Sequence, residues 1–371
     1  VSYRYGNHIL PAPNTTPESL ELQKILRQMA DDKTTHCIAE VSSHALDLGR
    51  VDDCDFDVAI FTNLTQDHLD YHGTMEAYYR AKERLFHDLI PHSRKSHPYR
   101  KVINGDDPWG VRLMNNDKEQ VLTFGLSSRH DVRADDIHLS LAGIEARIHI
   151  GEASFPIVSS LTGKFNLYNI LAAAAGAFAL DVPLTAIGEG IARMNGVPGR
   201  MERVSVSGEP WVFVDYAHTD DALSKALEML GVFGKNRLVT LFGCGGDRDH
   251  GKRSMMGKAA SQLSHRVIVT SDNPRSEEPL AIIGEIEKGI LPEMAKVPPA
   301  ELFKNGKQSY CVILDRREAI ETAIRLAHED DIILIAGKGH EDYQIVGGKR
   351  LFFDDRVTAR SCLNQRKRME Q

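Results

Sequence analysis

Short apolar runs alternate with longer segments of helical periodicity through most of the chain, a pattern typical of α/β proteins. In the first half, the pattern predicts buried strands at 36–41, 57–63 and 101–104 and a helix at 75–87. In the second half, it predicts strands at 211–214, 237–242, 266–270, 310–314 and 331–336. Helices between the strands, for example at 221–230 and 317–327, favour parallel pairing. Each half therefore predicts one open parallel sheet with helices on its faces.

The pattern changes between these two halves. From 121 to 160, apolar and polar residues alternate without helical periodicity, which predicts an antiparallel β insertion. An alanine-rich buried helix then begins near Gly163, and the Val-Pro-Gly-Arg segment at 197–200 is typical of a linker. We therefore predict two domains, residues 1–197 and 198–371.

The composition is that of a globular protein, with 42% hydrophobic and 26% charged residues among 371, enough for two or three domains. A net charge of −7 argues against a nucleic-acid-binding protein. The longest apolar run, 170–180, is too short to span a bilayer, and no signal peptide is visible. Five scattered cysteines without metal-binding spacing indicate reduced thiols in the cytoplasm. The first residues resemble the interior of a protein, so we expect a fragment that lacks an N-terminal part.

Candidate metal ligands follow two predicted strands of the first half. The segment 40–44 (Glu-Val-Ser-Ser-His) follows the strand at 36–41, and 63–68 (Asn-Leu-Thr-Gln-Asp-His) follows the next strand. Because parallel strands end at one edge of a sheet, Glu40 and His68 are expected near each other, where they would suit a divalent cation beside a phosphate. Alternatively, His68 caps a helix and Glu40 pairs with a nearby Arg. The pattern alone makes Lys82, on the predicted helix, a solvated surface residue.

A candidate amino-acid pocket lies after three predicted strands of the second half. Asp272-Asn-Pro-Arg275 follows the strand at 266–270, and a guanidinium is suited to gripping a carboxylate. The glycine-rich segment 243–248 fails as a dinucleotide-binding motif because its last position is Arg248. Glu341 follows the strand at 331–336 and can accept from an ammonium. Together these residues suit a ligand with carboxylates and an amine, although each could form only a surface salt bridge.

The order of these motifs closely resembles the Mur ligases of peptidoglycan synthesis over essentially the whole chain. The resemblance is greatest to the members that add 2,6-diaminopimelate to UDP-N-acetylmuramoyl-L-alanyl-D-glutamate. It implies an α/β fold in which a central ATP-binding-type parallel sheet domain, incomplete and with an antiparallel β insertion, precedes a Rossmann-like C-terminal domain. The resemblance further implies that ATP phosphorylates the dipeptide carboxylate, that the amine of diaminopimelate attacks the acyl phosphate, and that closure of the second domain brings the two together.

The resemblance also implies roles for individual residues. Contacts to the UDP-muramoyl dipeptide are implied for Asn14, Thr15, Thr16, Ser42 and Arg50. Magnesium ligands are implied for Glu40, His68 and Lys82, the last as a carbamate, and with Arg200 these are the implied catalytic residues. Nucleotide contacts are implied for Asn166, Asn169, Arg200, Asp215 and His218. The meso-diaminopimelate pocket is implied for Arg248, Asp272, Asn273, Pro274, Arg275, Gly337 and Glu341.

Two departures from the family pattern qualify these implications. Leu48 stands where some members have a substrate-contacting Gln. The family's ATP-binding loop, Gly-Thr-x-Gly-Lys-Thr/Ser, is not found in the 371 residues, and by the family's order it would precede Val1. Without that loop, we expect no amino-acid-dependent phosphate release from this chain alone. We also expect a cytoplasmic monomer. The alternatives are an L-lysine-adding relative, a folylpolyglutamate synthase, or a catalytically incomplete binding module.

Overall fold

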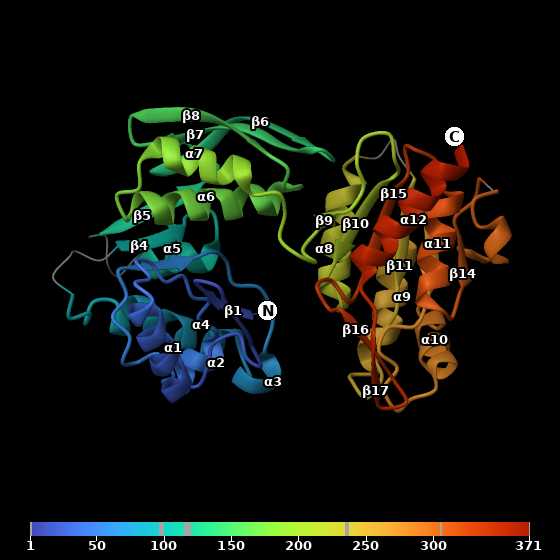
Figure 1. Cartoon of the computed structure of the whole chain (residues 1–371), viewed down its shortest axis with the longest axis horizontal. Helices are drawn as coiled ribbons and strands as arrows, with labels where there is room; N and C mark the ends of the chain where they lie inside the picture. Colours follow the sequence, from blue (N-terminus) through green and yellow to red (C-terminus); the bar gives the residue numbers. More distant parts are fainter. Residues whose placement is uncertain (1, 96–99, 115–119, 234–236, 305, 371) are drawn as a thin grey trace. The chain divides into compact units, whose positions relative to one another are not determined.

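The computed structural model describes residues 2–95, 100–114, 120–233, 237–304 and 306–370 (Figure 1). The chain divides into two compact units. Unit one comprises Val1–His138, Glu145–Val158 and Phe165–Arg193, and unit two comprises Leu139–Ile144, Ser159–Lys164 and Met194–Gln371. Each unit has its own sheet and its own hydrophobic core.

Unit one is built on a six-stranded sheet. Its strands, in order across the sheet, are β3 (Val58–Phe61), β4 (Arg100–Asn104), β5 (Val121–Gly125), β6 (Val132–Ser140), β7 (Gly143–Ile150) and β8 (Ala153–Ser159). A separate hairpin pairs β1 (Ser2–Tyr5) with β2 (His8–Pro11). The helices are α1 (Ser19–Asp31), α2 (Ser43–Asp47), α3 (Leu69–His72), α4 (Met75–Arg84), the π-helical turn η1 (Leu85–Leu89), α5 (Pro108–Met114), α6 (Lys164–Phe178) and α7 (Leu184–Arg193).

The strands of unit one are partly parallel and partly antiparallel. Strands β3, β4, β5 and β6 pair in parallel, which confirms the predicted strands at 57–63 and 101–104. Strands β6, β7 and β8 are consecutive neighbours joined by two-residue turns, so they form an antiparallel meander. The predicted insertion is therefore confirmed for β6 to β8. It was wrong for β5, whose alternating residues belong to the parallel part of the sheet.

Helix α4 carries its buried face into the core of unit one. Thr74 caps the helix by accepting from the backbone N–H of Ala77 at 3.1 Å. Tyr78 and Tyr79 are buried in the same cluster as Phe61 of β3. This packing fixes the rotation of α4 and therefore the direction in which Lys82 projects.

The predicted strand at 36–41 was wrong. Residues 34–42 belong to no strand or helix, and Ile38 is 98% exposed. The apolar run has the composition of a strand, but β3 is hydrogen-bonded only to β4 among the described residues, so no ladder reaches 36–41. An extended segment forms a strand only when a neighbouring strand pairs with its backbone groups.

Unit two is built on a seven-stranded sheet. Across the sheet the strands are β13 (Ala295–Lys296), β14 (Ser309–Val312), β12 (Arg266–Val269), β11 (Leu238–Phe242), β15 (Ile332–Ala336), β10 (Trp211–Asp215) and β9 (Glu202–Arg203). All pairs are parallel except that of β9 with β10. A separate hairpin pairs β16 (Tyr343–Val346) with β17 (Lys349–Phe352). The helices are α8 (Asp220–Gly231), α9 (Gly251–Leu263), α10 (Pro279–Glu287), η2 (Pro299–Glu301), α11 (Arg316–Leu326) and α12 (Asp355–Glu370).

Helices cover both faces of the second sheet. Phe213 of β10 packs in one core cluster with residues of α8, α9 and α10, whereas Val212 and Val214 pack in the other with α11 and α12. Because both faces are covered, the strands read as continuous apolar runs rather than alternating ones. The five strands predicted for this half are all present, and the doubly covered parallel sheet confirms the Rossmann-like class.

A fully buried ion pair fixes the loop after β15. Arg316 at the start of α11 and Asp355 at the start of α12 have no exposed surface, and their closest nitrogen–oxygen distance is 2.7 Å. The Arg316 guanidinium also donates to the carbonyl of Ala336 at 2.9 Å, where β15 ends. The pair therefore holds the strand end from which Gly337 and Glu341 follow.

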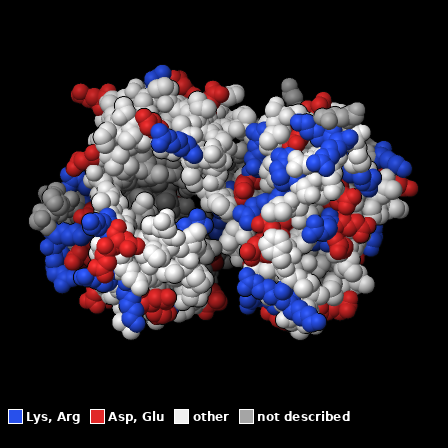
Figure 2. Space-filling view, viewed as in Figure 1, with Lys and Arg blue, Asp and Glu red and all other residues white. Residues whose placement is uncertain are grey.

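The surface charge, the thiols and the helix lengths add three observations. Lys and Arg are interspersed with Asp and Glu on the face shown in Figure 2, so the negative net charge is not gathered into one acidic area there. All five cysteine thiols are free. Within the described ranges, every helix is too short or too polar to cross a bilayer.

Candidate functional site

Thr16 joins the first segment of unit one to the residues around Glu40. Its side chain is buried, and its hydroxyl donates to the carbonyl of Glu40 at 2.9 Å and accepts from the N–H of Ser42 at 3.0 Å. Ser42 in turn caps α2 by accepting from the N–H of Ala45. The Thr16 contacts fix the backbone of 40–42 although no strand forms there, and they leave the Glu40 carboxylate exposed.

Arg50 braces the same segment from the end of α2. Its guanidinium donates to the carbonyl of Thr16 at 3.2 Å and pairs with Glu18 at 2.7 Å. The side chains of Asn14 and Thr15 are exposed beside this brace. Thr16, Glu40, Ser42 and Arg50 thus lie together, and no ion pair between Glu40 and an Arg is present in the described part of the chain.

His68 and Lys82 both lie close to the ring of Tyr78. His68 adopts a left-handed backbone conformation (φ 53°) at the N-terminus of α3, and its ring lies edge-on to Tyr78 with centroids 5.9 Å apart. The amine of Lys82 lies 5.2 Å from the centre of the Tyr78 ring. His68 occupies a capping position, but its side chain makes no capping hydrogen bond. The Nδ1 atom of the imidazole instead lies 3.7 Å from a carboxylate oxygen of Asp67.

Burial lowers the pKa of Lys82 below its ordinary value, and the carboxylates of Glu40 and Asp67 oppose that shift. Both carboxylates must lie close enough to act on the Lys82 amine. Glu40, Asp67 and Lys82 therefore share one electrostatic environment, which the sequence pattern did not indicate for Lys82. A lowered pKa increases the neutral fraction of the amine at physiological pH.

Asn166 and Asn169 lie in the first two turns of α6, and Asn166 is among the first four residues, whose backbone N–H groups have no partner within the helix. Asn166 is buried and accepts from the Asn169 amide at 3.2 Å, while Asn169 is exposed. Between them, Tyr168 donates to Asp106 at 3.0 Å and so ties α6 to the turn after β4. Burial, with the Asp106 contact, raises the pKa of Tyr168 to about 12.

In unit two, Asp215 organises the other candidate nucleotide contacts. Its carboxylate accepts from the N–H of Met201 at 2.6 Å and from that of Ala217 at 2.8 Å. Burial raises its pKa, and Arg200 is among the groups that oppose the shift. The Arg200 guanidinium lies 5.1 Å from the ring centre of Tyr216. His218 lies two residues after Tyr216, and its ring bonds the Tyr216 carbonyl at 2.8 Å.

The loop after β12 brings Asn273 against Glu341. The Asn273 amide donates to one carboxylate oxygen of Glu341 at 3.0 Å, and its own oxygen accepts from the N–H of Ile345 at 2.9 Å. Asp272 is buried next to Gly337, where a Cβ would lie 2.7 Å from a carboxylate oxygen of Asp272. Gly337 (φ 115°) therefore permits this close approach. Asp272, Asn273, Pro274, Gly337 and Glu341 form one cluster.

Arg275 is held by its backbone and by its side chain. Its backbone is left-handed (φ 54°), and it pairs with the hairpin through N–H bonds from Arg275 to the Ile345 carbonyl and from Gly347 to the Arg275 carbonyl. Its guanidinium donates to the carbonyl of Gly246 at 2.6 Å. One nitrogen of the group is thus anchored, and the side chain is directed before any ligand arrives.

Arg248 lies on the neighbouring loop, residues 243–248. A Cβ at Gly245 of this loop would lie near the side chains of both Arg248 and Arg275. Its side chain is exposed, and within the described residues it makes no ion pair. The two loops approach each other closely at Gly246. A Cβ there would lie 1.9 Å from the carbonyl oxygen of Pro274, so a larger residue would not fit. The structure thus places all seven pocket candidates on adjoining loops of one unit.

Sequence reasoning missed two features of this pocket. Lys338 has no exposed surface and donates to Asn273 and Glu341, although it lies between two predicted pocket residues. The hairpin of β16 and β17, which pairs with Arg275, was not predicted. The segment 343–352 alternates weakly around Gly347-Gly348, and that glycine pair was the available signal for a turn.

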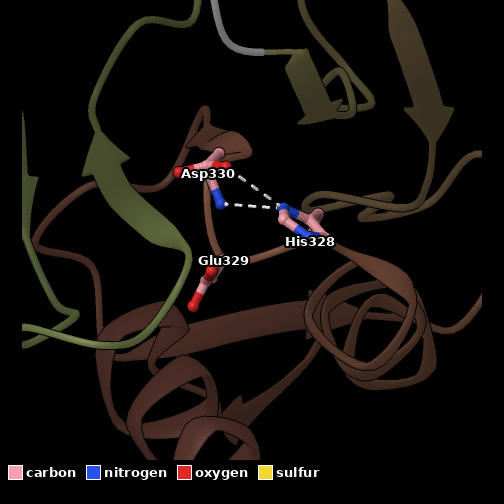
Figure 3. Close-up of side chains that lie close together, drawn as sticks. All are labelled: His328, Glu329 and Asp330. Carbon is pink, nitrogen blue, oxygen red and sulfur yellow. Dashed lines mark hydrogen bonds and ion pairs between the residues drawn. The ribbon is translucent and has the colours of Figure 1, made fainter.

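The structure also shows one surface group of potential metal ligands. In the described ranges, only His328, Glu329 and Asp330 bring three such side chains within reach of one another, and all three are exposed. In Figure 3, Asp330 lies against the His328 ring, while the Glu329 side chain points away from both. These contacts are those of a turn after α11, and none of the predicted metal ligands belongs to the group.

Comparison with known proteins identifies the family. The profile of the Mur ligase middle domain matches residues 2–177, and that of the Mur ligase glutamate ligase domain matches 199–339. The UDP-N-acetylmuramoyl-L-alanyl-D-glutamate–2,6-diaminopimelate ligase of Geobacter sulfurreducens is 45% identical over 361 residues, 97% of this chain and 71% of that protein. The ligase of the same name from Geobacter metallireducens is 47% identical, over 96% of this chain and 70% of that protein.

A solved structure agrees with these relatives. A UDP-N-acetylmuramoyl-L-alanyl-D-glutamate–2,6-diaminopimelate ligase is 39% identical, superposes with a TM-score of 0.67, and is matched over 98% of this chain and 72% of that one. Both domain profiles occur in the family's order, and relatives of this name align over nearly the whole chain. The chain therefore belongs to the Mur ligase family, in its diaminopimelate-adding branch.

Proposed function

We propose that this chain acts in the ATP-dependent addition of meso-2,6-diaminopimelate to UDP-N-acetylmuramoyl-L-alanyl-D-glutamate. The observation that carries the proposal is the anchored guanidinium of Arg275 beside the paired Asn273 and Glu341. Diaminopimelate has an ammonium and a carboxylate at each end. An arginine, an amide and a glutamate complement such an end group in charge and in hydrogen bonding. The relatives of this chain carry the name of this reaction.

The chemistry explains the need for ATP. A carboxylate is a poor electrophile, so the terminal carboxylate oxygen first attacks the γ-phosphorus of ATP and ADP leaves. The neutral amine of diaminopimelate then attacks the carbonyl carbon of the acyl phosphate. The carbon–oxygen bond to phosphate breaks, inorganic phosphate leaves with the bonding electrons, and the nitrogen loses one proton. Arg200 contributes positive charge to the anionic intermediate, and Glu341, by binding the ammonium at the other end of diaminopimelate, helps to position the incoming amine.

We assign a magnesium site to Glu40, His68 and Lys82. When bound, Mg2+ offsets the charge between the dipeptide carboxylate and the γ-phosphate. The donor set fits once Lys82 is a carbamate, because its neutral amine can combine with CO2 and release a proton. The lowered pKa of Lys82 favours that neutral amine. With isotope-labelled bicarbonate, the chain should show one carbamate NMR signal that disappears in Lys82→Ala. Persistence of the signal in that variant contradicts the assignment.

The remaining contacts follow the same assignment. We place the UDP-muramoyl dipeptide on Asn14, Thr15, Thr16, Ser42 and Arg50, and ATP on Asn166, Asn169, Arg200, Asp215 and His218. The buried hydrogen bonds of Thr16 and Asp215 support these roles because they fix the loops that carry the neighbouring side chains. We also propose a domain boundary at 197/198, a monomer, and a cytoplasmic location, since ATP and a UDP-linked substrate occur there.

The test is a substrate comparison with the ligase expressed from its gene. Phosphate release and product mass are measured with ATP and the UDP-muramoyl dipeptide, adding meso-diaminopimelate, L-lysine or no amino acid. Diaminopimelate should support turnover, and lysine should support little more than the blank. Equal or better use of lysine would make this a lysine-adding relative. Turnover with a folate and glutamate instead would refute peptidoglycan chemistry.

A further inference from the structure

Lys338 is a charged side chain without any exposed surface. Its ammonium donates to the amide oxygen of Asn273 at 3.3 Å and to a carboxylate oxygen of Glu341 at 3.3 Å. It also lies 5.4 Å from the ring centre of Tyr343. An ammonium is removed from water only when nearby groups compensate it, and here a carboxylate, an amide and an aromatic ring do so.

These contacts determine which way the Asn273 amide points. Its oxygen accepts from both Lys338 and the N–H of Ile345, so a flip of the amide would turn its NH2 group toward two donors and remove both of these hydrogen bonds. Its nitrogen donates one hydrogen to Glu341. The second amide hydrogen has no further partner among the described residues. The amide is therefore fixed with an N–H available to a ligand oxygen.

Lys338 also makes the two carboxylate oxygens of Glu341 differ in their hydrogen bonds. One oxygen accepts from both Lys338 and Asn273, at 3.3 and 3.0 Å. The other has only a long contact of 3.4 Å from the Tyr343 hydroxyl. That second oxygen is consequently the one left to accept from a ligand ammonium. The buried ammonium and the carboxylate also cancel in charge, so the base of the pocket favours a zwitterion over a lone cation.

We propose that Lys338 is a positioning residue that sets the amino-acid specificity of this pocket. Its ammonium fixes the Asn273 amide and one Glu341 oxygen, so that the pocket presents one N–H and one free carboxylate oxygen to an ammonium–carboxylate end group. The inference rests on the proposed function, because that function identifies the ligand as diaminopimelate. Lys338 touches no reacting atom, and its effect should therefore appear in amino-acid binding.

The experiment compares two variants of the ligase expressed from its gene. Lys338→Met keeps the aliphatic stem and removes the charge and the donor, whereas Lys338→Gln keeps one donor for Asn273. For Lys338→Met we expect the KM for diaminopimelate to rise by about tenfold or more, the scale of a lost charged hydrogen bond. The KM values for ATP and for the UDP-muramoyl dipeptide should stay within about twofold, a factor far smaller than that bond. Lys338→Gln should fall between Lys338→Met and the wild type.

A matched control separates positioning from general charge loss. Lys225→Met removes an exposed lysine of α8 whose ion pair among the described residues is with Asp221, and it should leave all three KM values unchanged. An unchanged diaminopimelate KM in folded Lys338→Met, or a proportionate rise in all three, overturns the inference. If Lys338→Met does not fold, the KM ratios of Lys338→Gln decide by the same criteria. Failure of the wild type to use diaminopimelate refutes the proposed function instead.

Discussion

The guanidinium of Arg253 donates to both carboxylate oxygens of Glu277, at 2.7 and 2.9 Å, although Arg253 has no exposed surface. Arg253 also donates to the Gly245 carbonyl, and Glu277 accepts from the N–H of Asp247. The pair therefore ties the loop of Arg248 to the loop of Arg275. The spacing between Arg248 and Arg275, both proposed to bind diaminopimelate, therefore depends on the Arg253–Glu277 pair, which contacts neither side chain.

Replacing Arg253 should loosen both loops. In Arg253→Met the guanidinium contacts to Glu277, Glu285 and Gly245 are lost together, and two carboxylates keep no cationic partner from α9. We expect the melting temperature to fall by several degrees and the KM for diaminopimelate to rise more than that for ATP. Lys225→Met, on the surface of α8, serves as the control. Equal KM values in variant and wild type would show that the loops are held by other contacts.

Glu277 gives this contact a pH dependence. Hydrogen bonds from Arg253 lower its pKa to about 2, from an ordinary value of 4.5. A group with a depressed folded pKa stabilises above its unfolded pKa and loses that contribution as the pH falls through the folded value. The stability difference between wild type and Glu277→Gln should therefore be constant above about pH 5 and shrink as the pH falls toward 2.

Chemical denaturation at several pH values measures that difference. Glu228→Gln is the control, because Glu228 is exposed on α8 without a hydrogen bond or ion pair among the described contacts. A pH dependence common to both variants would come from the loss of a carboxylate as such. A Glu277→Gln difference that grows on acidification has the wrong sign and would remove Glu277 from the acid-sensitive groups.

The sheet of unit two could be predicted from the sequence because its central strands are buried on both faces. Strands such as β11 and β15 therefore read as unbroken apolar runs. The run at 36–41 was also predicted to be a strand, although His36 and Glu40 interrupt its apolar residues, and it forms none. Strand formation depends on a neighbour elsewhere in the chain, and a local pattern carries no information about that neighbour.

The site was predictable where side chains with a recognisable chemistry follow strand ends, and not where the contact is made by backbone groups or by packing. Asn273 and Glu341 were assigned to one pocket, and the structure joins them by a hydrogen bond. The pairing of Arg275 with Val346 joins residues 71 positions apart through backbone groups, which are the same for every residue type. The full burial of Lys338 is likewise set by the packing of several segments around it.

Gly199 is a position where one methyl group should be costly. Its φ is +66°, and a Cβ there would lie 2.0 Å from the backbone nitrogen of His340. Gly199→Ala must therefore displace the loop that carries Gly339 or change its own backbone, at a cost of about 1–3 kcal/mol. Gly284→Ala in α10 is the control: no atom lies within 4 Å, and helix propensity predicts a gain of about 1 kcal/mol. Denaturant midpoints compare the two, and an unchanged midpoint for Gly199→Ala would contradict the close approach.

Lys82 should be essential as an anion rather than as a cation. Lys82→Ala removes the carbamate donor, and Lys82→Arg keeps a positive charge that does not form one. Both variants should lose nearly all turnover, and acetate or formate should partly restore only Lys82→Ala by occupying the vacated volume. Phosphate release with and without the added carboxylate measures this. A turnover near the wild-type value in Lys82→Arg would show that the residue acts as an ammonium.

Arg275 should distinguish diaminopimelate from lysine. The two amino acids differ by one carboxylate at the far end, and the Arg275 guanidinium is already anchored to Gly246 before a ligand binds. Removing one partner of a buried charged pair costs about 2–5 kcal/mol. Arg275→Ala should therefore lose most of its kcat/KM with diaminopimelate. Lysine use should rise little, because deleting a repulsive cation does not create a new ammonium site.

Arg275→Lys tests whether charge or geometry matters in that pocket. A lysine at 275 retains the positive charge but cannot donate to Gly246 and to a carboxylate in the planar arrangement of a guanidinium. It should therefore recover only a small part of the diaminopimelate efficiency lost in Arg275→Ala. The measurement is kcat/KM for both amino acids in the wild type and the two variants. Full recovery in Arg275→Lys would mean that the pocket reads net charge alone, and unchanged diaminopimelate use in Arg275→Ala would mean that another cation, with Arg248 the nearest candidate, holds the far carboxylate.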